Sequence, residues 1–69
     1  MNYYIVNTNA QPVSNDHEVH VNTCAHLPLP VHQLGLGYFN SCREAVAAAK
    51  RHYSDTNGCY FCCNACHTT

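Results

Sequence analysis

The sequence is poor in the residues that build large cores and in those that bind nucleic acid. It has no Trp, one Met and two Phe in 69 residues. In a chain of this length, a single hydrophobic core rarely contributes more than about 3–5 kcal/mol to the free energy of folding. Lys and Arg together number three, too few for the phosphate contacts that dominate nucleic-acid affinity. We expect one small domain, residues 1–69, that needs a metal ion or cross-link for stability, with nucleic acid as its least favoured partner.

Long apolar runs are also missing. The run near the start, Tyr3-Tyr4-Ile5-Val6, is short, whereas a membrane-spanning helix needs about 20 apolar residues. No basic segment precedes it, as one would in a secretory signal peptide. We therefore expect a cytoplasmic protein with no membrane segment. Disulfides are rare in that reducing compartment.

Cysteine is the residue that the chain has in excess, with six in all. Four of them form two consecutive C-x-x-C units, Cys59/Cys62 and Cys63/Cys66. In a reducing compartment this spacing indicates metal or redox chemistry more than a disulfide framework, which we rank second. A C-x-x-C turn lets two thiolates face one ion, and two such chelating units complete the tetrahedron that Zn²⁺ prefers. His is able to replace one of the cysteines.

An isolated H-x-x-x-C unit, His20 to Cys24, supplies the other half of a four-ligand set. Residues four apart on a continuous strand lie about 13 Å from each other, so the chain must turn between these two. Asn22 and Thr23 are suitable turn residues. The preferred pair in the tail is Cys59/Cys62, because a glycine precedes it directly after the helix. The first predicted set of zinc ligands is His20, Cys24, Cys59 and Cys62.

Two other ligand sets stay open. One keeps His20 and Cys24 and uses Cys63 and Cys66, which lie nearer the terminus and would fray unless tied down. The other uses the four tail cysteines alone, although adjacent cysteines rarely bind one ion without strain. His67 is a reserve ligand.

The remaining cysteine and histidines have simpler interpretations. Cys42 lies on the apolar stripe of the predicted helix and is expected as a small buried hydrophobic residue. His17 is expected to be structural. The other histidines have no partner pattern and are expected to be solvated: His26, His32 and His52.

The predicted fold is of the α+β class. Residues 3–8 and 17–21 indicate two antiparallel strands, with Val19 and Val21 on one face of the second. Residues 35–39 indicate a short third strand, and Pro28 and Pro30 hold the chain before it extended. Residues 54–58 have turn composition. We expect a small antiparallel sheet of two to three strands, one helix at about residues 41–53 and a C-terminal zinc knuckle.

The helix has the clearest local signals. Ser41 and Glu44 fit a capping box, in which each side chain satisfies a free backbone N–H of the other residue. Residues 45–49 are nearly all alanine, the best helix former. An apolar stripe for packing on the sheet runs through Cys42, Ala45, Val46, Ala49 and Tyr53.

These motifs together resemble the zinc-binding domain of the bacterial DNA-alkylation repair protein Ada. They are more similar still to small uncharacterised bacterial proteins with the pattern V-H-x-x-x-C…F-x-S-x-x-E-A…C-x-x-C, matched over about Val19 to Cys62. The resemblance implies a zinc ion held by His20, Cys24, Cys59 and Cys62 on a small sheet with a helix. In Ada the first ligand is a cysteine that accepts a methyl group. Since His20 stands there, methyl transfer is not carried over.

The functional prediction is a structural zinc-binding module, not an enzyme, that mediates protein interaction. The alternative is a thiol redox or metal-transfer protein that uses the C-terminal pairs; Cys63, Cys66 and His67 lie outside the Ada pattern. Nucleic-acid binding ranks third.

Overall fold

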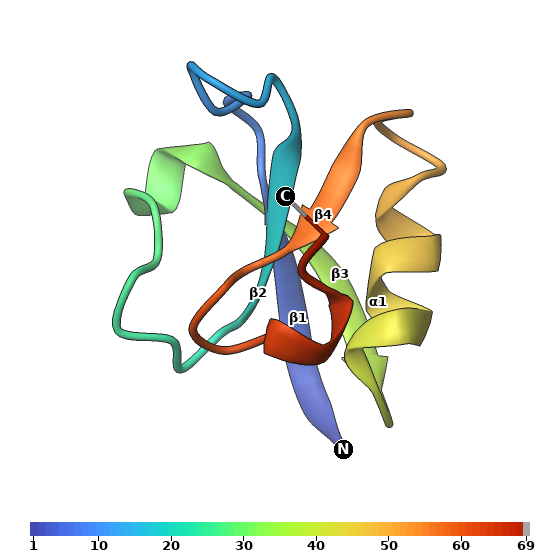
Figure 1. Cartoon of the computed structure of the whole chain (residues 1–69). Helices are drawn as coiled ribbons and strands as arrows, with labels where there is room; N and C mark the ends of the chain where they lie inside the picture. The colour runs from blue at the N-terminus through green and yellow to red at the C-terminus, as the bar shows by residue number, and fades with distance from the viewer. Residues whose placement is uncertain (69) are drawn as a thin grey trace.

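The computed structural model of the chain describes residues 1–68 and has a sheet with one α-helix beside it (Figure 1). The α+β class is therefore confirmed. The elements in chain order are β1 (Asn2–Asn7), β2 (His17–Val21), the 3-10 turn η1 (Pro30–His32), β3 (Gln33–Phe39), α1 (Cys42–Ala49), β4 (Thr56–Gly58) and the 3-10 turn η2 (Asn64–Cys66). The strand order across the sheet is β3-β1-β2-β4.

The sheet is mixed and has one more strand than the sequence indicated. β1 pairs antiparallel with β2, as expected, and also with β3, but β4 pairs parallel with β2. The prediction of a wholly antiparallel sheet of two to three strands was wrong in this respect. Strand β4 has three residues, Thr-Asn-Gly, and its composition is that of a turn. It becomes a strand because its backbone pairs with the edge of β2. The local sequence does not indicate this pairing.

The segment between β2 and α1 differs from the prediction in two places. Pro30 begins a 3-10 turn rather than extended chain, because proline fits the first helical position, where its missing N–H is not needed. β3 then starts at Gln33, two residues earlier than expected. The pairing with β1 shifts register between Tyr4 and Ile5, and Gly37 has φ 115°. That left-handed backbone favours glycine.

The helix forms where predicted but is shorter than residues 41–53. Ser41 Oγ accepts the backbone N–H of Glu44 at 3.4 Å. The Glu44 carboxylate accepts from the N–H of Asn40 at 3.0 Å rather than from that of Ser41. The α-helix ends at Ala49, and backbone hydrogen bonds from residues 50–53 continue the turn after it, the last from Tyr53 N–H to the Ala49 carbonyl.

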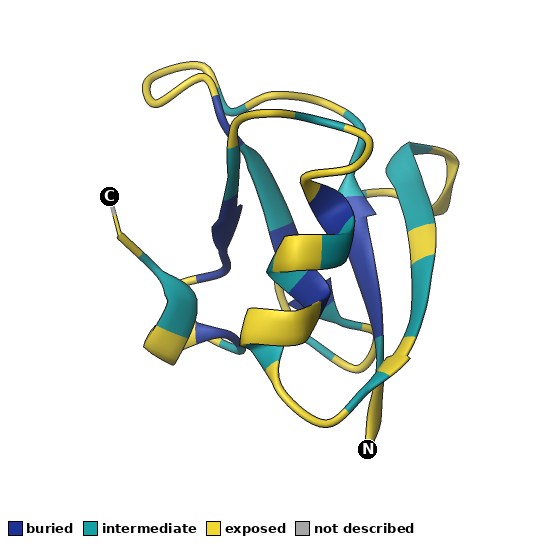
Figure 2. Cartoon of the chain, turned by 90° about the vertical axis from the view of Figure 1, so that its right-hand side faces the viewer, coloured by how far each residue is buried: buried dark blue, intermediate teal, exposed yellow. Residues whose placement is uncertain are grey.

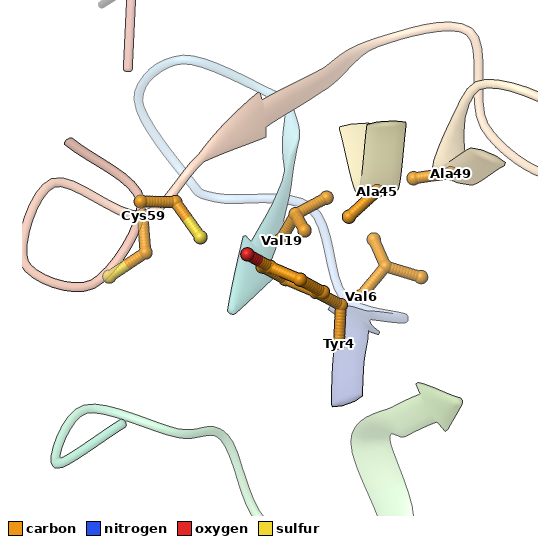
Figure 3. Packing of buried hydrophobic residues seen from close by; sticks show 7 residues of the cluster. Tyr4, Val6, Val19, Ala45, Ala49 and Cys59 are labelled. Atoms are coloured by element: carbon orange, nitrogen blue, oxygen red, sulfur yellow. The ribbon is translucent and has the colours of Figure 1, made fainter. Parts of the chain in front are cut away.

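The hydrophobic core lies between α1 and one face of the sheet (Figures 2 and 3). Side chains from β1 and β2 meet the small residues of the helix, so that two alanines let α1 approach the strands closely. The fully enclosed members of this cluster are Tyr4, Val6, Val19, Ala45, Ala49, Cys59 and Cys63. Val46 and Tyr53 pack at its margin, which confirms the apolar stripe of the helix.

The opposite face of the sheet carries His20. Ile5 pairs with His20 and Val6 with Val19 across β1 and β2. Because side chains alternate along a strand, Ile5 and His20 lie on the face away from α1. Both are buried, and His20 lies beside Cys24 from the segment after β2 and Cys62 from the C-terminal segment.

A disulfide joins Cys42, the first residue of α1, to Cys66 in η2. Cys42 packs partly buried against the core, in line with the expected small hydrophobic residue, but its sulfur also forms a cross-link that was not expected. The cross-link attaches the C-terminal segment to the start of the helix. In Figure 1 this segment loops out beyond β4 and folds back toward it. Within residues 1–68, no helix is long and apolar enough to cross a membrane.

Candidate metal centre

Four side chains from distant parts of the chain converge at one point. They are His20, Cys24, Cys59 and Cys62. One ligand atom from each lies within 4.8 Å of every other. The structure thus brings together the four residues of the first predicted set, and together they can hold a metal ion.

The turn that the H-x-x-x-C spacing required is present. β2 ends at Val21, and the N–H of Cys24 donates to the Val21 carbonyl at 3.0 Å. This hydrogen bond closes a tight turn through Asn22 and Thr23. The turn brings the sulfur of Cys24 back toward the imidazole of His20 instead of carrying it along the strand.

The tail makes a second tight turn. Cys59 directly follows β4, and its N–H donates to the carbonyl of Val19 at 2.9 Å. Four residues on, the N–H of Cys63 donates to the Cys59 carbonyl, also at 2.9 Å. The turn thereby returns Cys62 to the side of Cys59. Gly58 allows it, because a Cβ there would lie 2.6 Å from the Cys63 carbonyl oxygen.

The distances between ligand atoms suit a tetrahedral ion. Cys24 Sγ lies 4.0 Å from Cys59 Sγ, and His20 Nδ1 lies 3.9 Å from Cys62 Sγ. A tetrahedron with a metal–sulfur bond of about 2.3 Å has edges of about 3.8 Å. These two pairs need to close by only a few tenths of an ångström around such an ion, and the pairs that lie furthest apart, within 4.8 Å, by up to about 1 Å.

Backbone N–H groups point at all three sulfurs. Cys24 Sγ accepts from His26 and Cys59 Sγ from Phe61, each at 3.4 Å and each two residues further along the chain. Cys62 Sγ accepts from Val21 at 3.3 Å. A divalent ion with three thiolates and a neutral imidazole carries one net negative charge. Such donors stabilise that charge, because hydrogen bonds to ionised acceptors are the stronger ones.

The second ring nitrogen of His20 faces a carboxylate. His20 Nε2 lies 3.5 Å from Glu18 Oε1 and has no hydrogen-bond partner among the described residues. At 3.5 Å the contact is too long for a good hydrogen bond. A carboxylate in this place is the usual partner of a metal-bound histidine, since it fixes the tautomer and the ring orientation. Sequence reasoning missed Glu18, although its position two residues before His20 on one strand face was a sufficient signal.

Burial sets the protonation states in the centre. It lowers the pKa of His20, helped by the nearby His26, so the neutral imidazole is favoured. It raises the pKa of Cys62 well above its ordinary value. Glu18 also has a raised pKa, from burial first and from the charge of Asp16 second. A thiolate at Cys62 is thus costly unless a cation compensates it.

An aromatic stack closes over the two cysteine turns. The rings of His26 and Phe61 lie 3.9 Å apart at 21°, and their backbone N–H groups are the two that donate to Cys24 and Cys59. The expectation that His26 is simply solvated was therefore incomplete. Tyr60 lies edge-on to Phe61 at 5.3 Å. Tyr60 and Phe61 are 56% and 64% exposed.

The reserve residues lie beside the centre but outside the four-atom cluster. Cys66 is bonded to Cys42, so its sulfur is not free as a thiolate while that bond is intact. His67 Nδ1 contacts the Gly58 carbonyl at 3.0 Å. Cys63 is a free, buried thiol whose sulfur is 3.9 Å from that of Cys62.

The other histidines lie away from the centre. His17 stacks on Tyr53 at 3.8 Å and its Nδ1 contacts the Asn7 carbonyl, which agrees with a structural role. A surface hollow of about 320 Å³ lies beside this stack and shares no residue with the four-atom cluster. It is lined by Ala10, Asn15, His17, His52, Tyr53, Ser54 and Asp55.

No protein-family model, curated protein or solved structure matches this chain. The resemblance to the zinc-binding domain of Ada therefore stays a prediction.

Proposed function

We propose that this chain is a structural zinc-binding module. In it, Zn²⁺ bound by His20, Cys24, Cys59 and Cys62 attaches the C-terminal segment to the end of β2. The observation that carries the proposal is the convergence of these four ligand atoms to within 4.8 Å. One nitrogen and three sulfurs at tetrahedral spacing form a donor set typical of zinc.

The closed donor set favours a structural role over a catalytic one. Four protein ligands fill the tetrahedron and leave no position for a reacting water. Structural zinc contributes about 10–16 kcal/mol of apparent binding free energy in small peptides at neutral pH. That exceeds the about 3–5 kcal/mol expected from a core of this size. We infer that the fold depends on the ion.

Native mass spectrometry of the purified protein tests the proposal, with one Zn²⁺ per chain as the expected result. Chelation should then abolish the dispersion of the NMR spectrum, and added Zn²⁺ should restore it. The matched variants are His20→Ala, which should lose the metal, and His52→Ala, an exposed histidine outside the cluster, which should keep it. A chain that purifies without metal and stays folded, or that binds Zn²⁺ equally well without His20, contradicts the proposal.

We further propose that the module acts by binding another protein. Support comes from Tyr60 and Phe61, which are exposed on the turn between two of the metal ligands. The ion would fix the shape of this turn. A partner recovered by the zinc-loaded protein should be lost with the variant Tyr60→Ser/Phe61→Ser and retained with Val13→Ser, a fully exposed apolar residue elsewhere.

Thiol redox chemistry is the second candidate function, and one observation favours it. Cys66 of the last C-x-x-C unit is disulfide-bonded to Cys42. A reversible potential of about −180 to −300 mV would indicate redox activity, whereas structural disulfides fall below about −300 mV. The same bond counts against the cytoplasmic location that we expected, because disulfides are rare there. Thiol trapping in intact cells tests the location.

Nucleic-acid binding remains the third-ranked candidate function. The three cations, Arg43, Lys50 and Arg51, are exposed in and just after α1. A salt-dependent affinity for DNA or RNA is the result that would raise its rank.

A further inference from the structure

Cys63 is a fourth cysteine sulfur beside the candidate centre, close to one of its ligand atoms but outside the four-atom cluster. Its Sγ lies 3.9 Å from the Sγ of Cys62. That is the separation found between ligand atoms of the cluster itself, 3.9 Å for His20 to Cys62 and 4.0 Å for Cys24 to Cys59. Cys63 is 3% exposed and takes no part in a disulfide. It is thus a sheltered thiol beside a sulfur that binds the ion.

We propose that Cys63 is an alternative metal ligand that exchanges places with Cys62. The inference rests on the zinc site proposed above and adds a second coordination state, His20, Cys24, Cys59 and Cys63. Two adjacent cysteines seldom bind one ion at once, because the backbone between them is too short. They can alternate without that strain.

The exchange needs no oxidant or reductant, because it only substitutes one thiolate ligand for another and transfers one proton. The bond from the ion to the sulfur of Cys62 breaks and the bond to the sulfur of Cys63 forms. The proton of the Cys63 thiol moves to Cys62 across their 3.9 Å contact. The number of thiolates on the ion stays at three, so the net charge of the centre does not change.

The other reserve residues are less suitable for this exchange. The sulfur of Cys66 is held in the disulfide, and the imidazole of His67 contacts the Gly58 carbonyl. Among residues 1–68, Cys63 is therefore the candidate for a second coordination state.

Such an exchange gives the site a path for releasing its ion. A ligand that leaves and returns opens the coordination sphere for a moment, so an incoming acceptor thiolate can bind. The site then functions as a metal-transfer centre as well as a structural one. Cys63 would set the rate of transfer.

The test compares Zn²⁺ binding by the wild type, Cys62→Ser, Cys62→Ser/Cys63→Ser and a matched double variant, Cys62→Ser/Ala65→Ser. Ala65 is exposed in the same segment. Affinities are measured by chelator competition in oxygen-free buffer without added reductant, which preserves the disulfide. We expect the Zn²⁺ affinity of Cys62→Ser and of the matched double variant to fall by no more than ~10–100-fold, the cost of changing a residue around the ligands. The variant lacking both thiols should lose far more.

Cobalt spectra give the second part of the same test. Cys62→Ser should keep the thiolate-to-Co²⁺ band intensity of three sulfurs, and the variant lacking both thiols should show that of two. Equal losses in Cys62→Ser and Cys62→Ser/Cys63→Ser would overturn the proposal. A wild type that binds no metal would instead remove the zinc site on which it rests.

If Cys62→Ser does not fold, the rate of Zn²⁺ transfer from the folded protein tests the proposal instead. In the zinc-loaded protein, Cys63→Ser should slow transfer of the ion to a small-molecule chelator by tenfold or more. Ala65→Ser should transfer it at the wild-type rate. A transfer rate unaffected by Cys63→Ser would also overturn the proposal.

Discussion

The imidazole of His20 lies between the candidate metal position and a carboxylate: its Nδ1 is 3.9 Å from Cys62 Sγ and its Nε2 is 3.5 Å from Glu18 Oε1. Metal binding at Nδ1 places the ring proton on Nε2, where it points at Glu18. A carboxylate in this position raises ligand basicity and fixes the ring. We therefore propose Glu18 as a positioning residue for the proposed zinc site.

Replacing Glu18 should weaken metal binding without abolishing it. We expect Glu18→Ala to lower Zn²⁺ affinity by about 10–100-fold, as measured by chelator competition. Glu18→Gln keeps an oxygen acceptor and should lose less. The control is Asp55→Asn, an exposed carboxylate away from the centre. An affinity of Glu18→Ala equal to that of the wild type would show that the contact has no role in binding.

The cluster of four candidate ligands could be predicted from the sequence because each half of it is local. H-x-x-x-C and C-x-x-C each place two donors within one turn of chain, and the geometry of a tetrahedral ion limits how two such pairs can combine. The structure brings His20, Cys24, Cys59 and Cys62 together accordingly. Glu18 was equally readable from the period of two along β2.

Features that depend on distant contacts were not readable. Residues 56–58 have turn composition and become a strand only because the edge of β2 pairs with them. The Cys42–Cys66 bond depends on where η2 packs against the start of α1, and six cysteines allow many pairings. The helix was readable because its cap, its alanines and its stripe are all local.

Metal affinity should rise with pH because the ion must displace protons from thiols. Burial raises the pKa of Cys62, so the metal-free centre holds a proton there at neutral pH. Each displaced proton adds about a tenfold increase in metal affinity per pH unit. Burial lowers the pKa of His20. Above pH 6.5, which is about the ordinary pKa of histidine, the imidazole is therefore already neutral and releases no proton when the metal binds. Affinity therefore falls as pH falls.

The variant His20→Cys isolates this effect. It adds one thiol that must lose a proton, so the slope of log affinity against pH between pH 7 and 8 should increase by about one. His52→Cys adds a thiol at an exposed residue outside the cluster and should leave the slope unchanged. Calorimetry in buffers of different ionisation enthalpy counts the protons directly. A slope of zero for the wild type would contradict thiolate coordination.

Removing the disulfide should cost stability but not the metal site. Cys42 and Cys66 are 24 residues apart, and closing a loop of this order stabilises a fold by about 3 kcal/mol. We expect Cys42→Ser/Cys66→Ser to lower the Tm of the zinc-loaded protein by on the order of 10–20 °C. Its Zn²⁺ stoichiometry should stay at one, because neither sulfur belongs to the cluster. Loss of the metal in this variant would show that Cys66 takes part in coordination.

Gly58 should be the glycine at which a side chain is least tolerated. An added Cβ would lie 2.6 Å from the Cys63 carbonyl oxygen and 2.8 Å from the Cys66 Cβ. The carbonyl belongs to backbone that the Cys59 turn and the disulfide both hold. Relief would therefore require moving the turn that carries Cys59 and Cys62. Gly58→Ala should destabilise the zinc-loaded protein by about 1–3 kcal/mol and also weaken Zn²⁺ binding.

Gly35→Ala is the matched control, because its added Cβ would meet the end of the half-buried Tyr3 side chain, which packs edge-on against the exposed ring of Tyr38, rather than backbone. Denaturant unfolding and chelator competition on both variants check the comparison. We expect Gly35→Ala to bind Zn²⁺ as the wild type does. If Gly58→Ala matches it in both stability and affinity, the return of the C-terminal segment onto β4 is not what positions the sulfurs of Cys59 and Cys62.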